Sequence, residues 1–199
     1  MFAQVIQGYV KDAARFTAVE QQWMKDLQPG AIGWLGSTGG LTQDGECIMV
    51  VRFASAEEAK ANGDRPEQDA WWRQIAPLFD GEPTFMDCTD VEIWGSGAFD
   101  DAGFVQVIQG RSDDMQRLAE IDSSFIEGSM ATLRPDLLGG LTARSGDRFT
   151  QVAYFTSEAE AREGERKELP AEQAEAMREW EKLVTDLRYL DLSEPWLRS

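Results

Sequence analysis

Residues 2–8 read FAQVIQG and residues 104–110 read FVQVIQG, so these seven positions differ only at Ala3 and Val105. A chain of 199 residues rarely repeats such a segment by chance, and repetition at a fixed spacing is the mark of a duplicated structural unit. The β-branched and alternating residues of the segment favour a β-strand. The repetition therefore predicts that the same strand opens each half of the fold.

Further matches extend the duplication over most of the chain. The spacing of the matches changes from 102 to 100 and back to 102, which we attribute to insertions and deletions in loops, where they are tolerated. The matching pairs are GGLT at 39–42 and 139–142, FASAEEA at 53–59 with FTSEAEA at 155–161, and Trp94 with Trp196. We interpret the chain as one unit written twice.

Each copy reads in the order β-α-β-β-α-β. In the first copy, Phe16, Val19 and Trp23 have helical spacing, and a hairpin follows across Asp44-Gly45. A short helix after a serine cap, a helix that begins at a proline and a closing strand over 85–94 complete the unit. This order predicts a ferredoxin-like α+β unit with helices on one face of its sheet.

The duplicated pattern also predicts the domain organisation. We expect a first ferredoxin-like repeat at 1–94, a glycine-rich linker at 95–103 and a second repeat at 104–199. A sheet with one bare face needs a cover, and a second copy of the same sheet supplies one. We therefore expect the two repeats to form an intrachain dimeric-α/β-barrel-like pseudo-dimer, as a monomer or within a homo-oligomer.

The formal net charge of −17 limits the classes of binding partner that we expect. Phosphate backbones and anionic membrane surfaces are repelled by an acidic protein, so we expect no nucleic-acid and no membrane partner. No apolar run reaches the length of a membrane span, and no signal peptide is visible, so a cytoplasmic location is expected.

The sequence contains no histidine and only two cysteines, Cys47 and Cys88. This composition removes histidine-based nucleophile systems, imidazole zinc sites and histidine-ligated haem. No phosphate-binding loop or calcium loop is present, so the sequence indicates no cofactor and no metal. Acid–base chemistry would fall to carboxylates, tyrosine, lysine, cysteine or water.

The βαββαβ order and the stretch MVVRFASAEEAKAN at 49–62 carry a family resemblance. A strand ending in an aromatic residue, then serine and an acidic, alanine-rich helix, resembles the antibiotic-biosynthesis-monooxygenase-like domains of the dimeric α/β-barrel superfamily. The resemblance covers both halves and implies a tandem fusion of two such domains. Members of this family include cofactor-free oxygenases of polycyclic aromatic substrates, haem-degrading enzymes and proteins without known activity.

Two tryptophans stand out because the second copy does not repeat them. Trp34 falls near Arg134 and Pro135 in the second copy, whereas Trp71 falls opposite Ala176. Trp71 is also about 100° around its helix from Trp72, which we place on the buried stripe. A flat aromatic ring suits stacking on a polycyclic substrate, so both residues are candidate substrate-binding residues, although filling the core is the alternative.

Polar candidates surround these tryptophans. Arg65 could stabilise an oxyanion and Asn62 could orient a hydroxyl, while helix capping is the alternative for Asp64 and its neighbours. Arg52 lies on a strand face opposite Phe53 and needs a partner there, which Gln4, Gln106 or an acidic residue could supply. Gln4 is also a third candidate substrate-binding residue. A structural network around Arg52 explains the pattern equally well.

Two hypotheses for function follow. The first is a cofactor-independent monooxygenase-like enzyme for an aromatic or polyketide-like small molecule. In that reading Arg52, Arg65 and Asn62 stabilise an anion, and Tyr9 or Asp64 accepts a proton. The second is a non-catalytic protein that binds a small hydrophobic or aromatic molecule, or an assembly protein, with the same barrel.

Overall fold

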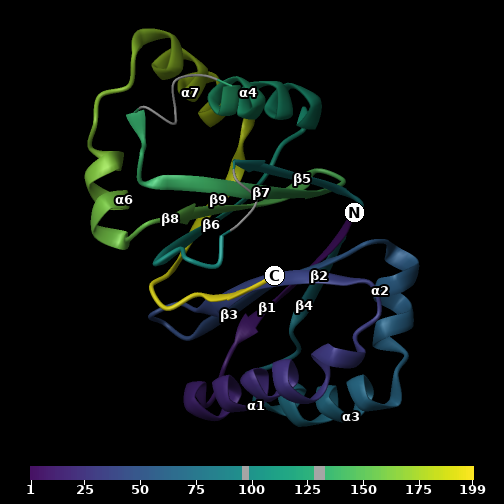
Figure 1. The fold of residues 1–199 in the computed structure, drawn as a ribbon. Helices are drawn as coiled ribbons and strands as arrows, with labels where there is room; N and C mark the ends of the chain where they lie inside the picture. Colours follow the sequence, from purple (N-terminus) through teal and green to yellow (C-terminus); the bar gives the residue numbers. More distant parts are fainter. Residues whose placement is uncertain (96–98, 128–132) are drawn as a thin grey trace. The chain divides into compact units, whose positions relative to one another are not determined.

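The protein consists of two compact units in a computed structural model that describes residues 1–95, 99–127 and 133–199 (Figure 1). The first unit contains Met1–Val91 and Pro195–Ser199, and the second unit contains Glu92–Glu194. Each unit therefore contains a strand from the other repeat of the sequence.

The first unit is a five-stranded antiparallel sheet in the order β10-β2-β3-β1-β4, with its helices on one face of the sheet (Figure 1). Asp12 caps the first helix by accepting a hydrogen bond from the backbone N–H of Arg15, and Ser55 caps the second in the same way. The elements are β1 (Phe2–Tyr9), α1 (Ala13–Asp26), the 3₁₀ turn η1 (Gln28–Gly30), β2 (Trp34–Leu41), β3 (Glu46–Phe53), α2 (Ala56–Gly63), α3 (Pro66–Ile75), the 3₁₀ turn η2 (Ala76–Leu78), β4 (Thr84–Cys88) and β10 (Trp196–Arg198).

The second unit repeats this plan, with the strand order β5-β7-β8-β6-β9. Ser157 caps α6 as Ser55 caps α2, because both serines follow the last residues of equivalent strands. The elements are β5 (Asp90–Gly95), β6 (Phe104–Arg111), α4 (Met115–Glu127), β7 (Leu137–Ser145), β8 (Arg148–Phe155), α6 (Glu158–Glu165), α7 (Ala171–Leu183) and β9 (Thr185–Leu192).

The α+β class and the tandem of two ferredoxin-like repeats are confirmed, since four strands of each sheet follow the same order. The single closing strand expected over 85–94 is wrong. The chain instead breaks near Thr89, so that β4 stays in the first sheet and β5 pairs with β7 of the second sheet. The repeat boundaries at 1–94 and 104–199 thus divide the sequence, whereas the compact units exchange their last strands. Residues 96–98 of the expected linker lie outside the described residues, and closure of the sheets into one barrel stays a prediction.

The strand register corrects the matching of GGLT between the halves. Gly36 lies opposite Arg52 and Gly139 lies opposite Tyr154, each directly after an irregularity in its strand pair. Their φ angles are 131° and 146°, a conformation that side chains rarely adopt, so both positions require glycine. Gly36 and Gly139 are therefore the equivalent residues, and the recurrence of GGLT at 139–142 is displaced from the structural match.

The helix-covered face of each sheet carries an aromatic core. In the first unit Phe16 and Phe79 meet edge to face, with ring centroids 5.0 Å apart. The expected burial of the neighbouring tryptophans is reversed, because Trp71 is 8% exposed while Trp72 is only partly buried. Cys47 and Cys88 are both buried, and they form no disulfide bond. Among the described helices, none combines the length and apolar character needed to cross a membrane.

Candidate functional site

A cavity of about 590 Å³ lies in the second unit and is called the large cavity here. Its floor is formed by β6, β8 and β9, and its walls come from α4, α6, α7 and Trp94 of β5. The side chains and backbone that line it belong to Trp94, Gln106, Ile108, Asp122, Phe125, Arg134, Leu137, Gln151, Ala153, Phe155, Arg162, Gly164, Glu165, Lys167, Leu169, Met177, Trp180, Tyr189 and Asp191. Its volume falls in the range of small-molecule sites.

The large cavity exists because the second repeat carries smaller residues at equivalent positions. Leu137 lies opposite Phe155 as Trp34 lies opposite Phe53, so leucine replaces tryptophan at that strand position. In the first unit, the ring of Trp34 packs on Trp23 with centroids 5.6 Å apart. The corresponding space of the first unit is reduced to about 120 Å³ and is called the small cavity below.

Asp122 places a carboxyl group in the wall of the large cavity. It is on α4, which buries one face against the sheet, and the residue is only 8% exposed. Trp180 on α7 donates an indole hydrogen bond from Nε1 to Asp122 Oδ1 at 3.1 Å. Burial removes the carboxylate from water and raises the pKa of Asp122 to about 6, although Arg144 and Trp180 oppose this change. A carboxyl group with such a pKa can accept or donate a proton near neutral pH.

Arg144 on β7 lies next to Asp122 and is itself buried. Its Nη2 is 3.6 Å from Asp122 Oδ2, and both Nη1 and Nη2 donate to Glu92 Oε2 on β5 at 3.3 Å. The guanidinium is thus shared between two carboxylates. The shorter contacts go to Glu92, so that Arg144 compensates the charge of Asp122 only in part.

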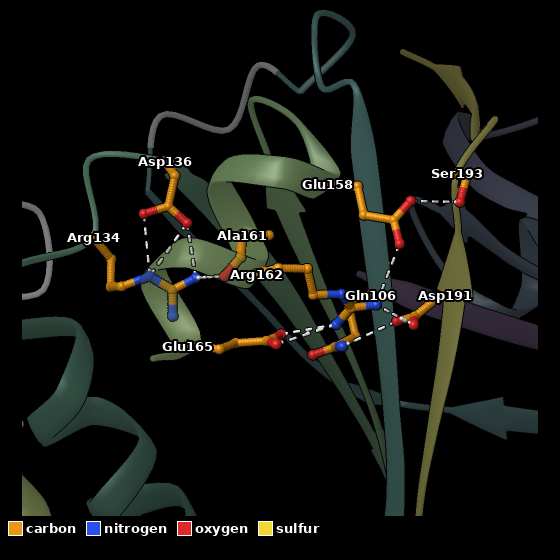
Figure 2. Close-up of polar contacts among 9 residues, drawn as sticks. All are labelled: Gln106, Arg134, Asp136, Glu158, Ala161, Arg162, Glu165, Asp191 and Ser193. Carbon is orange, nitrogen blue, oxygen red and sulfur yellow. Dashed lines mark hydrogen bonds and ion pairs between the residues drawn. The ribbon is translucent and has the colours of Figure 1, made fainter. Parts of the chain in front are cut away.

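The wall of the large cavity also holds a polar network around Arg162 of α6 (Figure 2). Arg162 donates to Glu165 at 3.0 Å and forms an ion pair with Asp191 of β9. Asp191 also accepts a hydrogen bond from Gln106 Nε2 at 3.0 Å. A carboxylate only accepts, so the amide nitrogen of Gln106 must face Asp191.

Arg134 forms a second cationic group in the cavity wall. It donates from Nε and Nη2 to Asp136 at 2.7 to 3.2 Å, and Nη2 also contacts the carbonyl oxygen of Ala161 at 3.3 Å (Figure 2). A Cβ at Gly164 would lie 2.2 Å from Arg134 Nε, so only glycine allows this packing. The guanidinium also lies over the ring of Phe155, 5.4 Å from its centroid.

The sequence-predicted residues lie in the first unit, and four of them line the small cavity together: Gln4, Trp34, Asn62 and Trp71. Trp71 is held by a hydrogen bond from its Nε1 to the carbonyl oxygen of Val19 at 3.0 Å. Asn62 Oδ1 accepts from the backbone N–H of Ile32 at 3.0 Å and from Arg65 Nη1 at 3.1 Å. Asn62 and Arg65 thereby fasten the loop before β2 to the end of α2.

The other predicted residues are not among those lining the small cavity. Asp64 is exposed and forms an ion pair with Lys60 one helical turn earlier. Arg52 lies on the sheet face opposite Phe53, as expected, and its Nε is buried with no hydrogen-bond partner among the described residues. Tyr9 is 48% exposed at the end of β1. The structure therefore brings Gln4, Trp34, Asn62 and Trp71 together and separates Arg52, Tyr9 and Asp64 from them.

Sequence reasoning missed Asp122 and the large cavity. One signal was present, because Glu20 and Asp122 are 102 positions apart and each interrupts the apolar stripe of its helix. An acidic residue kept inside a buried stripe in both copies indicates a partner within the core. In the first unit that partner is Arg198 of β10, which donates to both carboxylate oxygens of Glu20.

Comparison with known proteins identifies the fold. No protein-family model matches the sequence, and neither does any curated protein. Two similar solved structures are described as putative monooxygenases. The one from Lactobacillus acidophilus NCFM is 10% identical, with a TM-score of 0.75 over 98% of this chain and 95% of its own chain. The one from Fusobacterium nucleatum is 10% identical, with a TM-score of 0.76 over 96% of this chain and 90% of its own chain. A third, named an anthrone oxidase-like protein, has 11% identity and a TM-score of 0.65 over 99% of this chain and 89% of its own.

These matches span both repeats, so they support the duplication as a property of the fold and not of one half alone. At such low identity they carry no information on individual site residues. The resemblance expected from the sequence is confirmed, and the chain has the two-repeat fold of monooxygenase-like proteins.

Proposed function

We propose that the second unit binds a flat aromatic molecule in the large cavity and oxidises it with O₂ without a cofactor. The observation that carries this proposal is a buried carboxyl, Asp122, in the wall of an aromatic cavity of about 590 Å³. The shared fold with a protein named as anthrone oxidase-like supports the same class of substrate.

The chemistry requires a proton acceptor and a surrounding that excludes water. Ionised Asp122 removes a proton from an acidic C–H or O–H group of the bound aromatic, and the resulting carbanion, or the phenolate conjugated with a ring carbon, gives its electrons to O₂. The proton returns to the peroxide that forms on the substrate carbon. Loss of water then leaves a carbonyl group, so that a methylene and O₂ become a ketone and one H₂O. Aromatic walls such as Phe125 and Trp180 hold the ring system flat beside the carboxyl group.

The first-unit residues predicted from the sequence give an alternative location for the site. Trp34 and Trp71 would be its walls, and Asn62 with Arg65 would stabilise an anion. Tyr9, Asp64, Arg52 and Gln4 complete that proposal. We favour the large cavity because its volume admits a polycyclic molecule, whereas about 120 Å³ does not.

Oxygen uptake by metal-free protein with a panel of anthrones and hydroxynaphthalenes tests the proposal. We expect uptake by the wild type, and a loss of at least about 100-fold in Asp122→Asn because general-base catalysis contributes that much. Quenching of tryptophan fluorescence measures binding separately. A variant that binds but no longer turns over assigns the proton transfer to Asp122.

Two further variants locate the site. Trp71→Ala enlarges the small cavity, and Arg65→Ala removes the hydrogen bond to Asn62 in its wall, whereas neither residue lines the large cavity. We expect them to retain activity if they fold, which circular dichroism checks. Activity that disappears in these variants and persists in Asp122→Asn would move the site to the first unit.

A non-catalytic binding protein is the second candidate function, and one observation favours it. The cavity cations Arg134 and Arg162 are each engaged by carboxylates of the protein, so neither stands ready to stabilise a substrate anion. Saturable binding of the panel with no oxygen uptake by any member would support this function over the oxygenase.

A further inference from the structure

The second unit contains three neighbouring charged groups, two of them buried, that the proposed chemistry uses only in part. Asp122 on α4, Arg144 on β7 and Glu92 on β5 stand in a row, with Arg144 in the middle. Asp122 and Arg144 are buried, whereas the side chain of Glu92 is 41% exposed. Glu92 is therefore the member of the row that solvent reaches.

We propose that Glu92 is a positioning residue that holds Arg144 away from Asp122 and so leaves Asp122 able to exchange a proton. Both terminal nitrogens of Arg144 contact one oxygen of Glu92 at 3.3 Å, whereas the contact to Asp122 is 3.6 Å. If Arg144 paired with Asp122 alone, its guanidinium would stabilise the Asp122 carboxylate strongly, because a nearby opposite charge favours the ionised form. Division of Arg144 between two carboxylates weakens this effect at Asp122.

The first unit supplies an internal comparison. Glu20 occupies the position equivalent to Asp122, and its cation Arg198 donates to both of its oxygens, in one case at 2.8 Å. Within the described part of the chain, Glu20 is the carboxylate with which Arg198 forms an ion pair. The position of Arg144 is taken by Leu41 there, because Leu41 lies opposite Cys47 as Arg144 lies opposite Phe149. The two repeats thus contain a tightly paired acid in the first unit and a loosely paired acid in the second.

The origin of Glu92 gives the exchanged strand a role in the site. β5 closes the first repeat of the sequence, yet it pairs with β7 and delivers Glu92 to Arg144. The acid in the large cavity is therefore adjusted by a residue encoded in the other repeat. A duplicated fold can thereby keep a buried acidic residue in both copies while the cation beside it is arranged differently in each copy.

Among the residues that the structure describes, Arg144 and Glu92 are the charged groups that act on Asp122 from the strands, and Trp180 of α7 donates its neutral indole N–H to it. Burial raises the pKa of Asp122 most, the charge of Arg144 and the hydrogen bond from Trp180 lower it, and the negative charge of Glu92 raises it. The other ionisable side chains lining the cavity are Arg134, Arg162, Glu165, Lys167, Tyr189 and Asp191.

The test is a ¹³C NMR titration of the Asp122 carboxyl carbon in the full chain without substrate, assigned by the signal missing in Asp122→Asn. In Glu92→Gln, Arg144 becomes available to Asp122, and we expect the midpoint to fall by about 1 pH unit. The matched control is Glu163→Gln, which removes a charge from the exposed face of α6 and is expected to leave the midpoint in place.

A midpoint that is unchanged or higher in Glu92→Gln overturns the proposal. Arg144→Gln provides a second readout, since removal of the cation is expected to raise the midpoint, and a fall would also contradict the assignment. Only the use of the Asp122 proton in catalysis rests on the proposed function. If the titration behaves as expected and no substrate is turned over, the oxygenase proposal fails while the role of Glu92 stands.

Discussion

Replacement of Asp122 by asparagine should change how the stability of the protein depends on pH. Burial raises the pKa of Asp122 from 3.8 to about 6, so the folded protein holds this proton over a range in which the unfolded chain has released it. Stability is therefore lost as the pH rises from about 4 to about 6, and the loss is complete above that range. Asparagine does not titrate and should not show this loss.

The expected magnitude follows from the same pKa values. Each pH unit between the two pKa values corresponds to about 1.4 kcal/mol, so the change from 3.8 to about 6 amounts to roughly 3 kcal/mol. The free energy of unfolding of Asp122→Asn, taken relative to the wild type, should therefore increase by roughly 3 kcal/mol between pH 4 and pH 7. Taking the difference removes the pH dependence that the other acidic residues contribute to both proteins.

Urea unfolding at five pH values between 4 and 8, followed by circular dichroism and tryptophan fluorescence, measures this difference. Asp147→Asn is the matched control, because the pKa of Asp147 is lowered by its hydrogen bond with Arg111 on the protein surface. The stability that Asp147 contributes is lost only as the pH falls below about 3.8, so its difference from the wild type should stay nearly constant between pH 4 and pH 8. Parallel curves for the wild type and Asp122→Asn, or a difference that falls with pH, would refute the reasoning about burial.

Three more substitutions test the packing around the two cavities. Leu137→Trp gives the second unit the residue type of the first and should fill the large cavity. It should weaken the binding of 2-naphthol at least about tenfold in a fluorescence titration. An unchanged affinity would place the ligand elsewhere. Gly164→Ala places a methyl group 2.2 Å from Arg134 Nε and should cost about 1–3 kcal/mol in urea unfolding through loss of the Arg134 contacts, whereas a neutral effect would show that the side chain moves freely. Arg198→Ala leaves Glu20 buried without its cation and should cost about 3–5 kcal/mol, and a cost below about 1 kcal/mol would mean that the pair is not desolvated.

The sequence alone determined the duplication, the order of elements in each repeat and the α+β class. These features depend on local periodicity, caps and turns, which are written within short stretches such as FAQVIQG at 2–8. The resemblance to monooxygenase-like proteins also came from local pattern, and the fold confirms it. Trp34 and Trp71 were recognised as peculiar to one copy because the duplication allowed direct comparison.

Only the tertiary structure decided where the large cavity lies and which acidic residue can exchange a proton there. The exchange of β5 and β10 depends on pairing between segments far apart in the chain, which no local signal reports. The tryptophans singled out in the first unit help to fill that unit, and the large cavity opens where the second repeat has smaller side chains. Asp122 stands in the sequence as one of 36 acidic residues, and it becomes distinctive only through burial beside Trp180 and a divided Arg144. A pKa depends on desolvation and on neighbouring charges, and both are fixed only when distant segments pack together.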